Sequence, residues 1–318
     1  MDGGQMGVPG RGEPARHDHG EWGTRRWCVI GAPSSAGAHT PGVEKAPAAL
    51  RGAGLLDALG RGGREPDDHG DVPGFRWRPD VRRPRAQNAA AVARVATSVA
   101  DAVQAAVAHG GRPLVLGGDC TVTIGLVAGH SRAATAPALV YVDGGPDLYT
   151  PETRANGNLD AMGLAHMLAL PGHLPEVAGV GPSVPLLAPE RVVAYGDALP
   201  PGDHERNLVE TLGMTHVPAD EVHAGPAAAA GRARAAAEDA ADAFVVHFDV
   251  DVLTFVTAPL ADVPEPAGLS LDEAVETLAT LADSPKFAGL TITEINPDHV
   301  PEPDLLHRFC EAVAGALT

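Results

Sequence analysis

The chain has 318 residues, enough for one large domain or two modest ones, and it carries 41 acidic against 23 basic residues. The resulting net charge of −18 argues against nucleic acids and anionic membranes as partners, because like charges repel. A surface that keeps the protein soluble explains this balance better than steering of a cationic substrate. Three widely spaced cysteines fit neither a disulfide framework nor a zinc knuckle, which favours the reducing cytoplasm as its compartment.

Residues 1–25 contain Gly, Pro, Arg and His but no apolar run, so they do not form a signal peptide. We predict that they are a disordered leader and that residues 26–318 form a single domain. No segment approaches the roughly 18 apolar residues that a membrane span needs.

The first elements follow in chain order. A short apolar run at 26–30, ended by Gly and Pro, predicts a buried strand. Leucines near helical spacing predict a helix at 47–59, and residues 60–87 are expected to form a loop. The Ala- and Val-rich stretch 88–109, which lacks Gly and Pro, predicts a long helix that ends at Gly110.

Five further apolar runs each stop at a polar cluster, and helical stretches separate most of them. The runs are 113–116, 138–142, 191–195, 244–248 and 287–293, and the helices are 203–212, 227–242, 270–283 and 304–317. Apolar strands that alternate with helices predict a parallel sheet covered on both faces. Ligands bind at the carboxyl ends of such strands, where Asp143, Asp249 and Glu294 lie, with Asp119 and Cys120 beside them.

These strand ends carry two pairs of acidic residues. Asp249 and Asp251 are two positions apart, and Asp143 and Asp147 bracket Gly-Gly-Pro. Carboxylates crowded at the edge of an apolar sheet repel one another unless a cation offsets their charge. Oxygen ligands suit hard divalent ions such as Mn²⁺ or Mg²⁺, so the pattern favours a metal site.

Seven segments together resemble the arginase–agmatinase (ureohydrolase) family. They are IGAPSSAGAHTPGVEKAPAALRGAGLL, LGGDCTVTIG, VDGGPDLYTPE, NGNLDAM, HFDVDVL, PEPAGLS and TITEINP, in family order over residues 27–317. The resemblance implies an α/β fold, a three-layer α/β/α sandwich with an eight-stranded parallel sheet. It also implies a homo-oligomer, a trimer or a hexamer, that acts on a small guanidino or amidino substrate.

The resemblance further implies a binuclear manganese site whose activated water attacks the guanidinium carbon. Asp143, Asp147, Asp249 and Asp251 match the four Asp ligands, and Glu294 matches the carboxylate that binds the guanidinium. A planar cation suits a bidentate carboxylate. The resemblance also makes Asn158 a candidate substrate contact and places the substrate-tail contacts in 196–205, where Asp197, Asp203 and Glu205 are the candidates.

Three positions depart from the family pattern. Cys120 and Gly145 stand where the two histidine ligands belong, and Asp160 stands where the proton-shuttling histidine belongs. Cys120 either ligates as a thiolate or merely fills the space, whereas Gly145 supplies no donor. We therefore expect one metal position, most simply Mn²⁺, to be occupied more readily than two. Asp160 either acts as an acid or base or is an ordinary loop residue.

Three histidines are candidate replacement ligands. His247 points to the same side of its strand as Asp249 but one layer deeper, which favours a core role, and His166 is expected to pack in the core or at the surface. His299 follows Glu294 in the last loop, within reach of the mouth of the site.

The sequence thus predicts a metal-dependent hydrolase that cleaves a C–N bond of a guanidino or amidino compound, with a modified arginine as one option. Asp147, Glu294 and Asp160 are its candidate catalytic residues. The alternative is a catalytically degenerate protein of the same fold with a binding or scaffold role and weak or absent metal binding. A third reading makes Cys120 a nucleophile, although no histidine partner for it is evident.

Overall fold

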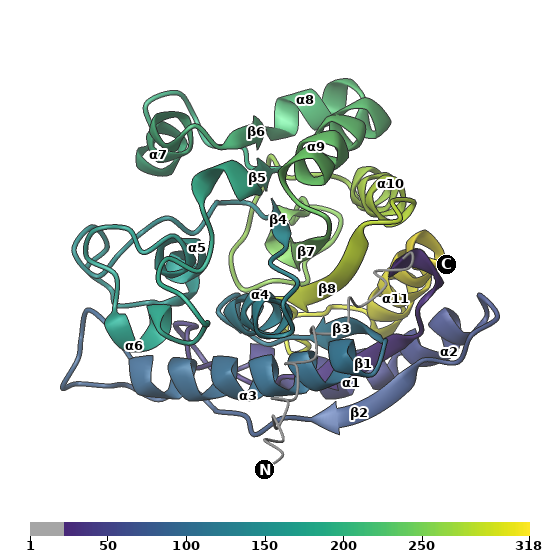
Figure 1. The fold of residues 1–318 in the computed structure, drawn as a ribbon, viewed down its shortest axis with the longest axis horizontal. Helices are drawn as coiled ribbons and strands as arrows, with labels where there is room; N and C mark the ends of the chain where they lie inside the picture. Colours follow the sequence, from purple (N-terminus) through teal and green to yellow (C-terminus); the bar gives the residue numbers. More distant parts are fainter. Residues whose placement is uncertain (1–21) are drawn as a thin grey trace, which may run out of the picture.

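A computed structural model describes residues 22–318, which form a sheet of eight parallel strands between helices (Figure 1). The strand order is β2-β1-β3-β8-β7-β4-β5-β6. This architecture confirms the predicted three-layer α/β/α fold. The strands are β1 (Trp27–Gly31), β2 (Asp67–Asp71), β3 (Arg112–Leu116), β4 (Ala138–Val142), β5 (Val192–Tyr195), β6 (Thr215–Val217), β7 (Phe244–Asp249) and β8 (Phe287–Thr293).

Eleven α-helices of the described chain connect and cover these strands (Figure 1). They are α1 (Ala46–Gly52), α2 (Leu55–Gly60), α3 (Ala89–Ala108), α4 (Val122–Arg132), α5 (Gly163–Met167), α6 (Pro175–Ala178), α7 (His204–Leu212), α8 (Ala219–Ala224), α9 (Pro226–Ala240), α10 (Leu271–Ala282) and α11 (Pro303–Leu317). Short 3-10 turns lie at Trp22–Thr24, Val43–Lys45, Asp160–Met162, Pro189–Arg191 and Val250–Val252.

Two hydrophobic cores cover the two faces of the sheet. Alternate strand residues such as Leu114 and Val246 pack with α1, α2, α9, α10 and α11, whereas Val115 and Val245 pack with α3, α4 and α5. Successive side chains of a strand point to opposite faces, so strands buried on both sides must be apolar throughout. The sheet is therefore rigid where its central strands end, and it can hold polar side chains there in fixed positions.

The structure corrects several predicted elements. The helix expected at 47–59 is two helices, because Gly54 adopts a left-handed φ of 87° between α1 and α2. The loop expected at 60–87 contains the edge strand β2, whose residues are all polar or Gly and are exposed. Strand β6 and helix α4 were not predicted. Strand β6 has only three residues, too few for a recognisable strand pattern. Helix α4 is buried on almost all sides, so it lacks the alternation of polar and apolar faces that predicts a helix.

The folded domain begins before residue 25, where the predicted leader was expected to end. Residues 1–21 of that leader lie outside the described residues. Trp22, in contrast, is only 2% exposed, and its backbone N–H donates to the carbonyl oxygen of Pro285 over 3.0 Å. The guanidinium of Arg25 lies 3.8 Å from the centre of the Trp22 ring. The folded domain therefore includes residues 22–25, which the sequence had assigned to the leader.

Helix α3 is long and apolar enough, by length and composition alone, to cross a membrane. The expectation that no segment approaches a span was therefore too strict for this helix. Its buried valines, among them Val92, Val95, Val99 and Val103, pack in the core shared with α4. An Ala/Val-rich helix with one buried face is what a covering layer of this sheet requires.

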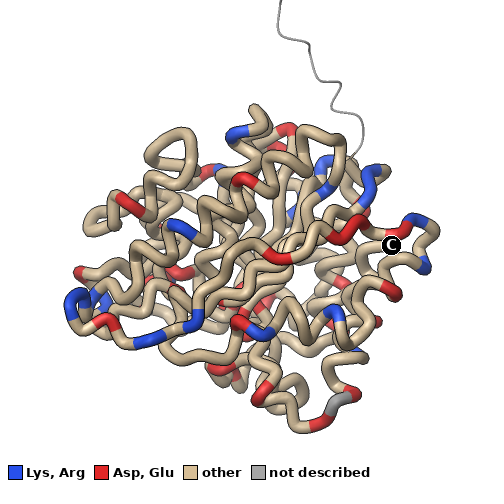
Figure 2. The backbone as a smooth tube through the Cα atoms, turned by 90° about the horizontal axis from the view of Figure 1, so that it is seen from below, with Lys and Arg blue, Asp and Glu red and all other residues tan. Residues whose placement is uncertain are grey.

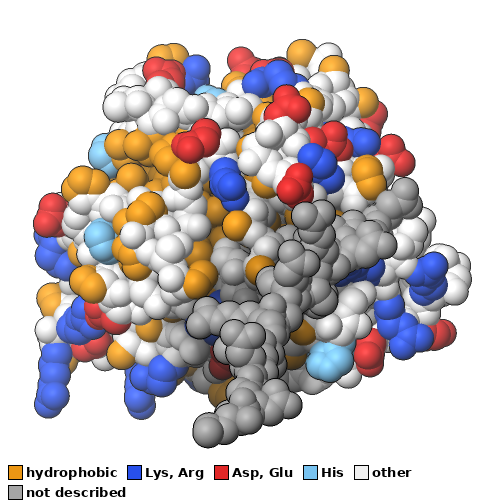
Figure 3. Space-filling view, viewed as in Figure 1, with side chains coloured by type: hydrophobic (Ala, Val, Ile, Leu, Met, Phe, Trp, Pro, Cys, Tyr) orange, Lys and Arg blue, Asp and Glu red, His pale blue; other side chains and the backbone are white. Residues whose placement is uncertain are grey.

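Charged residues of both signs are spread over the fold (Figure 2). The face in Figure 3 likewise carries scattered acidic and basic side chains with hydrophobic ones between them. The large acidic excess is not confined to the surface, because seven Asp and Glu residues at the carboxyl edge of the sheet or nearby are buried. They are Asp119, Asp143, Asp147, Asp197, Glu205, Asp249 and Glu294.

Candidate functional site

A cleft of about 210 Å³ opens at the carboxyl edge of the four adjacent central strands β3, β8, β7 and β4. These strands end in the segments that carry Cys120, Glu294, Asp249 and Asp143 respectively. The segments are far apart in sequence, and the parallel pairing of the strands brings them to one place. The acidic residues that line the cleft are Asp143, Asp147, Asp160, Glu205, Asp249, Asp251, Glu265 and Glu294.

The segment after β4 supplies two of these carboxylates. Oδ1 of Asp143 accepts a hydrogen bond from the backbone N–H of Gly145 over 2.8 Å. Asp147 adopts a left-handed φ of 51°, and its Oδ2 lies 2.5 Å from the hydroxyl of Tyr141. Burial and the charges of neighbouring carboxylates raise the pKa of both Asp143 and Asp147 well above the ordinary value. Both carboxyls therefore favour the protonated form unless a cation is nearby.

The end of β7 supplies Asp249 and Asp251. Oδ1 of Asp249 accepts from the backbone N–H of Asp251 over 2.7 Å, and Oδ1 of Asp251 accepts from the N–H of Gly144 over 3.0 Å. Burial followed by mutual repulsion raises the pKa of Asp249 well above its usual range, and burial also raises the pKa of Asp251. The two turns are thus joined by carboxylate–backbone bonds, which fix their relative position.

Cys120 lies in the turn between β3 and α4 and is 3% exposed. Its Sγ lies 2.5 Å from Oδ2 of Asp249, and its backbone N–H donates to Oδ1 of Asp160 over 2.8 Å. Burial and the nearby carboxylates raise the pKa of the Cys120 thiol well above its ordinary value. Without a cation the sulfur is therefore a neutral thiol, which speaks against a free nucleophilic thiolate.

Asp160 approaches the cleft from the long segment after β4. Burial, and next the charge of Asp119, raise the pKa of Asp160 to about 7. Its carboxylate lies near the side chains of Cys120 and Glu294, with one ligand atom of each within 4.8 Å of the others. A carboxyl with this pKa can both accept and release a proton near neutral pH.

Glu294 and Asn158 present buried acceptors that have no partner among the described residues. Oε1 of Glu294 and Oδ1 of Asn158 are both buried without a hydrogen bond, and both residues line the cleft. Glu294 also adopts a left-handed φ of 64°, a conformation that Glu rarely takes outside constrained sites. Buried acceptors of this kind require a donor, so the cleft is shaped for a ligand that carries N–H groups.

The donors in the cleft do not fit a binuclear manganese site. Position 145 has no side chain, and a Cβ atom there would lie 3.5 Å from Oε2 of Glu205, the nearest atom. Asp251 is held by the backbone of Gly144, and no imidazole replaces the histidine lost at position 145 within the described residues. The half of the site around Cys120, Asp143 and Asp249 does offer a compact set of donors for one cation.

Most of the sequence-predicted site residues come together in this cleft. They are Cys120, Asp143, Asp147, Asn158, Asp160, Asp249, Asp251 and Glu294. Asp197 does not join them, because it lines a neighbouring hollow and its Oδ2 lies 2.7 Å from Nε2 of His216. His166 is buried on α5, and Nδ1 of His299 lies 3.0 Å from Asp262. Neither of these two histidines lines the cleft.

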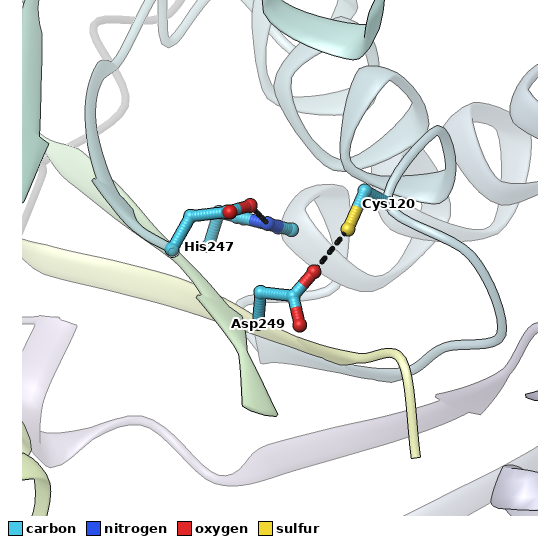
Figure 4. Close-up of side chains that lie close together, drawn as sticks. Cys120, His247 and Asp249 are labelled. Carbon is cyan, nitrogen blue, oxygen red and sulfur yellow. Dashed lines mark hydrogen bonds and ion pairs between the residues drawn. The ribbon is translucent and has the colours of Figure 1, made fainter. Parts of the chain in front are cut away.

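Three further residues, His247, Glu205 and Arg154, lie at the site. Nε2 of His247 lies 3.1 Å from Oδ2 of Asp143, so this histidine belongs to the group around Cys120 and Asp249 (Figure 4). Glu205 extends from α7, where its Oε1 accepts from the N–H of Leu148 over 2.7 Å. Two of them had a sequence signal, because His247 lies on the same side of its strand as Asp249 and Glu205 falls in 196–205, where the resemblance places substrate-tail contacts.

Arg154, the third of these residues, is the one basic side chain that lines the cleft. Its guanidinium lies 4.8 Å from the ring centre of Tyr149, whose ring stacks on His204 at 5.4 Å. Within residues 22–318 the guanidinium has no side-chain hydrogen bond or ion pair. The cleft therefore combines several carboxylates with one half-exposed guanidinium, whose charge acts on the Glu205 carboxyl and which forms no direct ion pair within the described residues.

An α/β/α sandwich with a carboxylate-lined cleft at its strand ends defines a ureohydrolase-type protein. The chain belongs to the arginase family, whose model matches residues 25–307. It is 31% identical over 299 residues to arginase-1 of Rattus norvegicus, covering 91% of this chain and 90% of that protein. The arginase of Bacillus caldovelox is 31% identical over 283 residues, covering 85% and 90% of the two chains.

Solved structures agree with this family assignment. The structure of Bacillus caldovelox arginase matches with a TM-score of 0.84 and 28% identity, covering 92% of this chain and 98% of the other. A proclavaminate amidino hydrolase from Streptomyces clavuligerus shares the fold, with a TM-score of 0.69 and 19% identity over 92% and 90% of the two chains. The resemblance inferred from the sequence motifs is thus confirmed.

Proposed function

We propose that this protein hydrolyses a C–N bond of a guanidino or amidino compound with the help of a divalent cation. The observation that carries the proposal is the pair of unpartnered buried acceptors, Oε1 of Glu294 and Oδ1 of Asn158, in a cleft lined by carboxylates. A guanidinium is planar, cationic and rich in N–H donors, so it matches both the acceptors and the negative charge.

Each residue of the cleft has a separate role in the proposed reaction. Glu294 accepts N–H bonds from the substrate and holds its guanidinium in place, and Asn158 accepts another. Asp160, with its pKa raised to about 7, accepts a proton from water and returns one to the departing nitrogen. A divalent cation held by the aspartates would supply the Lewis acidity that activates water.

Arg154 points to the class of substrate. A free guanidinium at the rim attracts an anionic group, and the floor of carboxylates attracts a cationic one. A molecule with a guanidinium at one end and a carboxylate at the other satisfies both. We therefore propose a guanidino carboxylic acid or a modified arginine as the substrate, rather than a purely cationic amine.

An assay for urea release from a panel of guanidino acids and guanidino amines tests the proposal, with Mn²⁺, Zn²⁺ or Fe²⁺ added to the chelated protein. We expect turnover that depends on a cation. Glu294→Gln should lower kcat/KM at least about 30-fold, because it removes the negative charge that faces the guanidinium of the bound substrate. Glu276→Gln on the exposed side of α10 is the matched control and should leave kcat/KM unchanged.

The alternative is a degenerate arginase-family protein with a binding or scaffold role. It is favoured if no cation produces turnover with any compound of the panel. Calorimetric titration of the same compounds then separates a binding protein, which retains affinity that Glu294→Gln abolishes, from a scaffold, which has none.

The cytoplasm and a homo-oligomer, a trimer or a hexamer, remain part of the proposal. Three free, buried cysteines support a reducing compartment. Analytical ultracentrifugation of the purified chain tests the oligomer.

A further inference from the structure

Four donors at the carboxyl ends of β3, β4 and β7 form one compact group. Figure 4 labels three of them, Cys120, His247 and Asp249. Cys120 follows β3, Asp143 follows β4, and His247 and Asp249 belong to β7. One ligand atom of each residue lies within 4.8 Å of the other three, and all four residues are buried. In a tetrahedral zinc site with bonds of about 2.0–2.3 Å, ligand atoms lie roughly 3.3–3.8 Å apart. The group lies close to that spacing, with Nε2 of His247 3.1 Å from Oδ2 of Asp143.

The ring of His247 is already oriented for such a role. Its Nδ1 lies 2.6 Å from Oγ1 of Thr123 and 3.3 Å from Oγ1 of Thr291, whereas its Nε2 faces Asp143. A proton on Nδ1, donated to Thr123, leaves the lone pair of Nε2 directed at the group. The ring also stacks on Tyr141, with centres 4.0 Å apart and planes at 21°. Histidines that bind a metal usually hold their other ring nitrogen in a hydrogen bond, as Nδ1 of His247 does here.

The chemistry of the donors favours a particular class of ion. A thiolate and an imidazole are softer than carboxylates and prefer Zn²⁺ or Fe²⁺ to Mn²⁺ or Mg²⁺. One thiolate and two carboxylates carry three negative charges, which a buried site tolerates only with a cation among them. A tetrahedral set of sulfur, nitrogen and two oxygens is also a coordination that zinc adopts.

We propose that the chain binds a single zinc or ferrous ion through Cys120, Asp143, His247 and Asp249, in place of a binuclear manganese centre. His247 takes over from one lost histidine by reaching the group from a deeper position on β7. The other half of the centre has no replacement at Gly145, and Asp251 bonds to the backbone of Gly144. The proposal concerns metal binding alone and does not depend on the proposed reaction.

Cobalt titration of the full-length, chelated protein tests the site, because Co²⁺ substitutes for zinc and reports its ligands by colour. We expect one Co²⁺ per chain, a thiolate-to-cobalt band in the near ultraviolet, and visible bands of tetrahedral strength. Cys120→Ser should abolish the thiolate band. Two tightly bound ions per chain, a weak octahedral spectrum, or no binding would each overturn the proposal.

Two variants separate this site from a binuclear one. His247→Asn should lower zinc affinity at least about 10-fold, since the loss of even an indirect ligand partner costs that much. Asp251→Asn should change zinc affinity by less than about 3-fold, because it lies outside the four donors, whereas a binuclear centre would lose most of its affinity. Unchanged affinity in folded His247→Asn protein contradicts the proposal.

A measurement on the natural chain covers the case in which a buried variant fails to fold. The X-ray absorption spectrum of the zinc-loaded protein should show one sulfur neighbour and the scattering pattern of one imidazole. Absence of either overturns the assignment. If the protein shows both features but is inactive, the proposed hydrolase is refuted and the proposed metal site stands. If the protein is active with two bound manganese ions, the proposed metal site is refuted and the hydrolase stands.

Discussion

At the scale of single residues, the site combines inherited positions with replacements. Asp143, Asp249 and Glu294 stand where the arginase-like motifs lead one to expect them, and all three line the cleft. Cys120 replaces a histidine, and His247 enters the same group from β7. In the proposed site, a donor missing at one position is offset by a donor at another, because the strand ends of a parallel sheet lie close together.

Arg154 provides a prediction at this scale. Arg154→Ala should raise KM for a guanidino carboxylic acid roughly 10-fold, which is the loss of one charged hydrogen-bonded contact. It should leave KM for an analogue with an uncharged tail unchanged, and kcat should change little. Steady-state kinetics with both substrates measure the difference.

Two further variants control this experiment. Arg154→Lys keeps the charge and should recover part of the affinity, and Arg94→Ala on the exposed side of α3 should have no effect. Equal loss for the charged and the uncharged substrate would show that Arg154 only supports the rim.

At the scale of elements, the turn between β3 and α4 decides where Cys120 lies. A Cβ atom on Gly118 would lie 1.7 Å from the carbonyl oxygen of Ser34, so the two backbones approach as closely as glycine allows. The backbone N–H of Asp119 donates to that same oxygen over 3.0 Å, and the N–H of Glu294 donates to the carbonyl of Gly118 over 2.9 Å. This turn therefore joins the segments that follow β1, β3 and β8, of which the last two carry site residues.

Gly118→Ala should destabilise the protein by about 2 kcal/mol or more, because the added methyl must displace backbone rather than a flexible side chain. It should also weaken metal binding, since Cys120 shifts with the turn. Urea denaturation measures the first effect and cobalt titration the second.

Gly231→Ala is the matched control, because a Cβ atom at that position in the middle of α9 would meet nothing within 4 Å. That substitution should stabilise the helix by up to roughly 1 kcal/mol. If Gly118→Ala proved as harmless as Gly231→Ala, the close approach to Ser34 would not be a constraint.

At the scale of the whole molecule, the free energy of unfolding of the metal-free protein depends on pH. Folding buries many carboxyl groups at one edge of the sheet, and burial raises the pKa of Glu205 from 4.5 to about 7. A carboxyl with a raised pKa in the folded state stabilises the fold fully below its unfolded pKa, and this contribution is lost as the pH rises through the folded value.

We therefore expect the free energy of unfolding of the chelated protein to fall between about pH 4.5 and pH 8. Glu205 alone contributes up to roughly 3 kcal/mol to this decline. Glu205→Gln should flatten that part of the curve, whereas Glu210→Gln on the exposed side of the same helix should not. Chemical denaturation at pH 5 and pH 8 with a chelator present measures the effect. Stability that rises over this interval would contradict the assignment.

The sequence alone determined the fold class and the location of the site. Runs such as 138–142 and 244–248 are apolar because both of their faces are buried, and the carboxylates that follow them mark the strand ends directly. These are local properties of the chain, so they can be read without a structure. Strand β2 could not be read in this way, because an exposed edge strand of polar residues lacks the apolar signature.

Only the tertiary structure decided which side chains meet. The strand period placed His247 on the same side as Asp249, but the depth at which it meets Asp143 depends on the register between β4 and β7. Glu205 and Arg154 reach the cleft from segments outside the sheet, and Asp197 is drawn away to His216. Contacts of this kind arise from long-range packing, which sequence spacing does not encode.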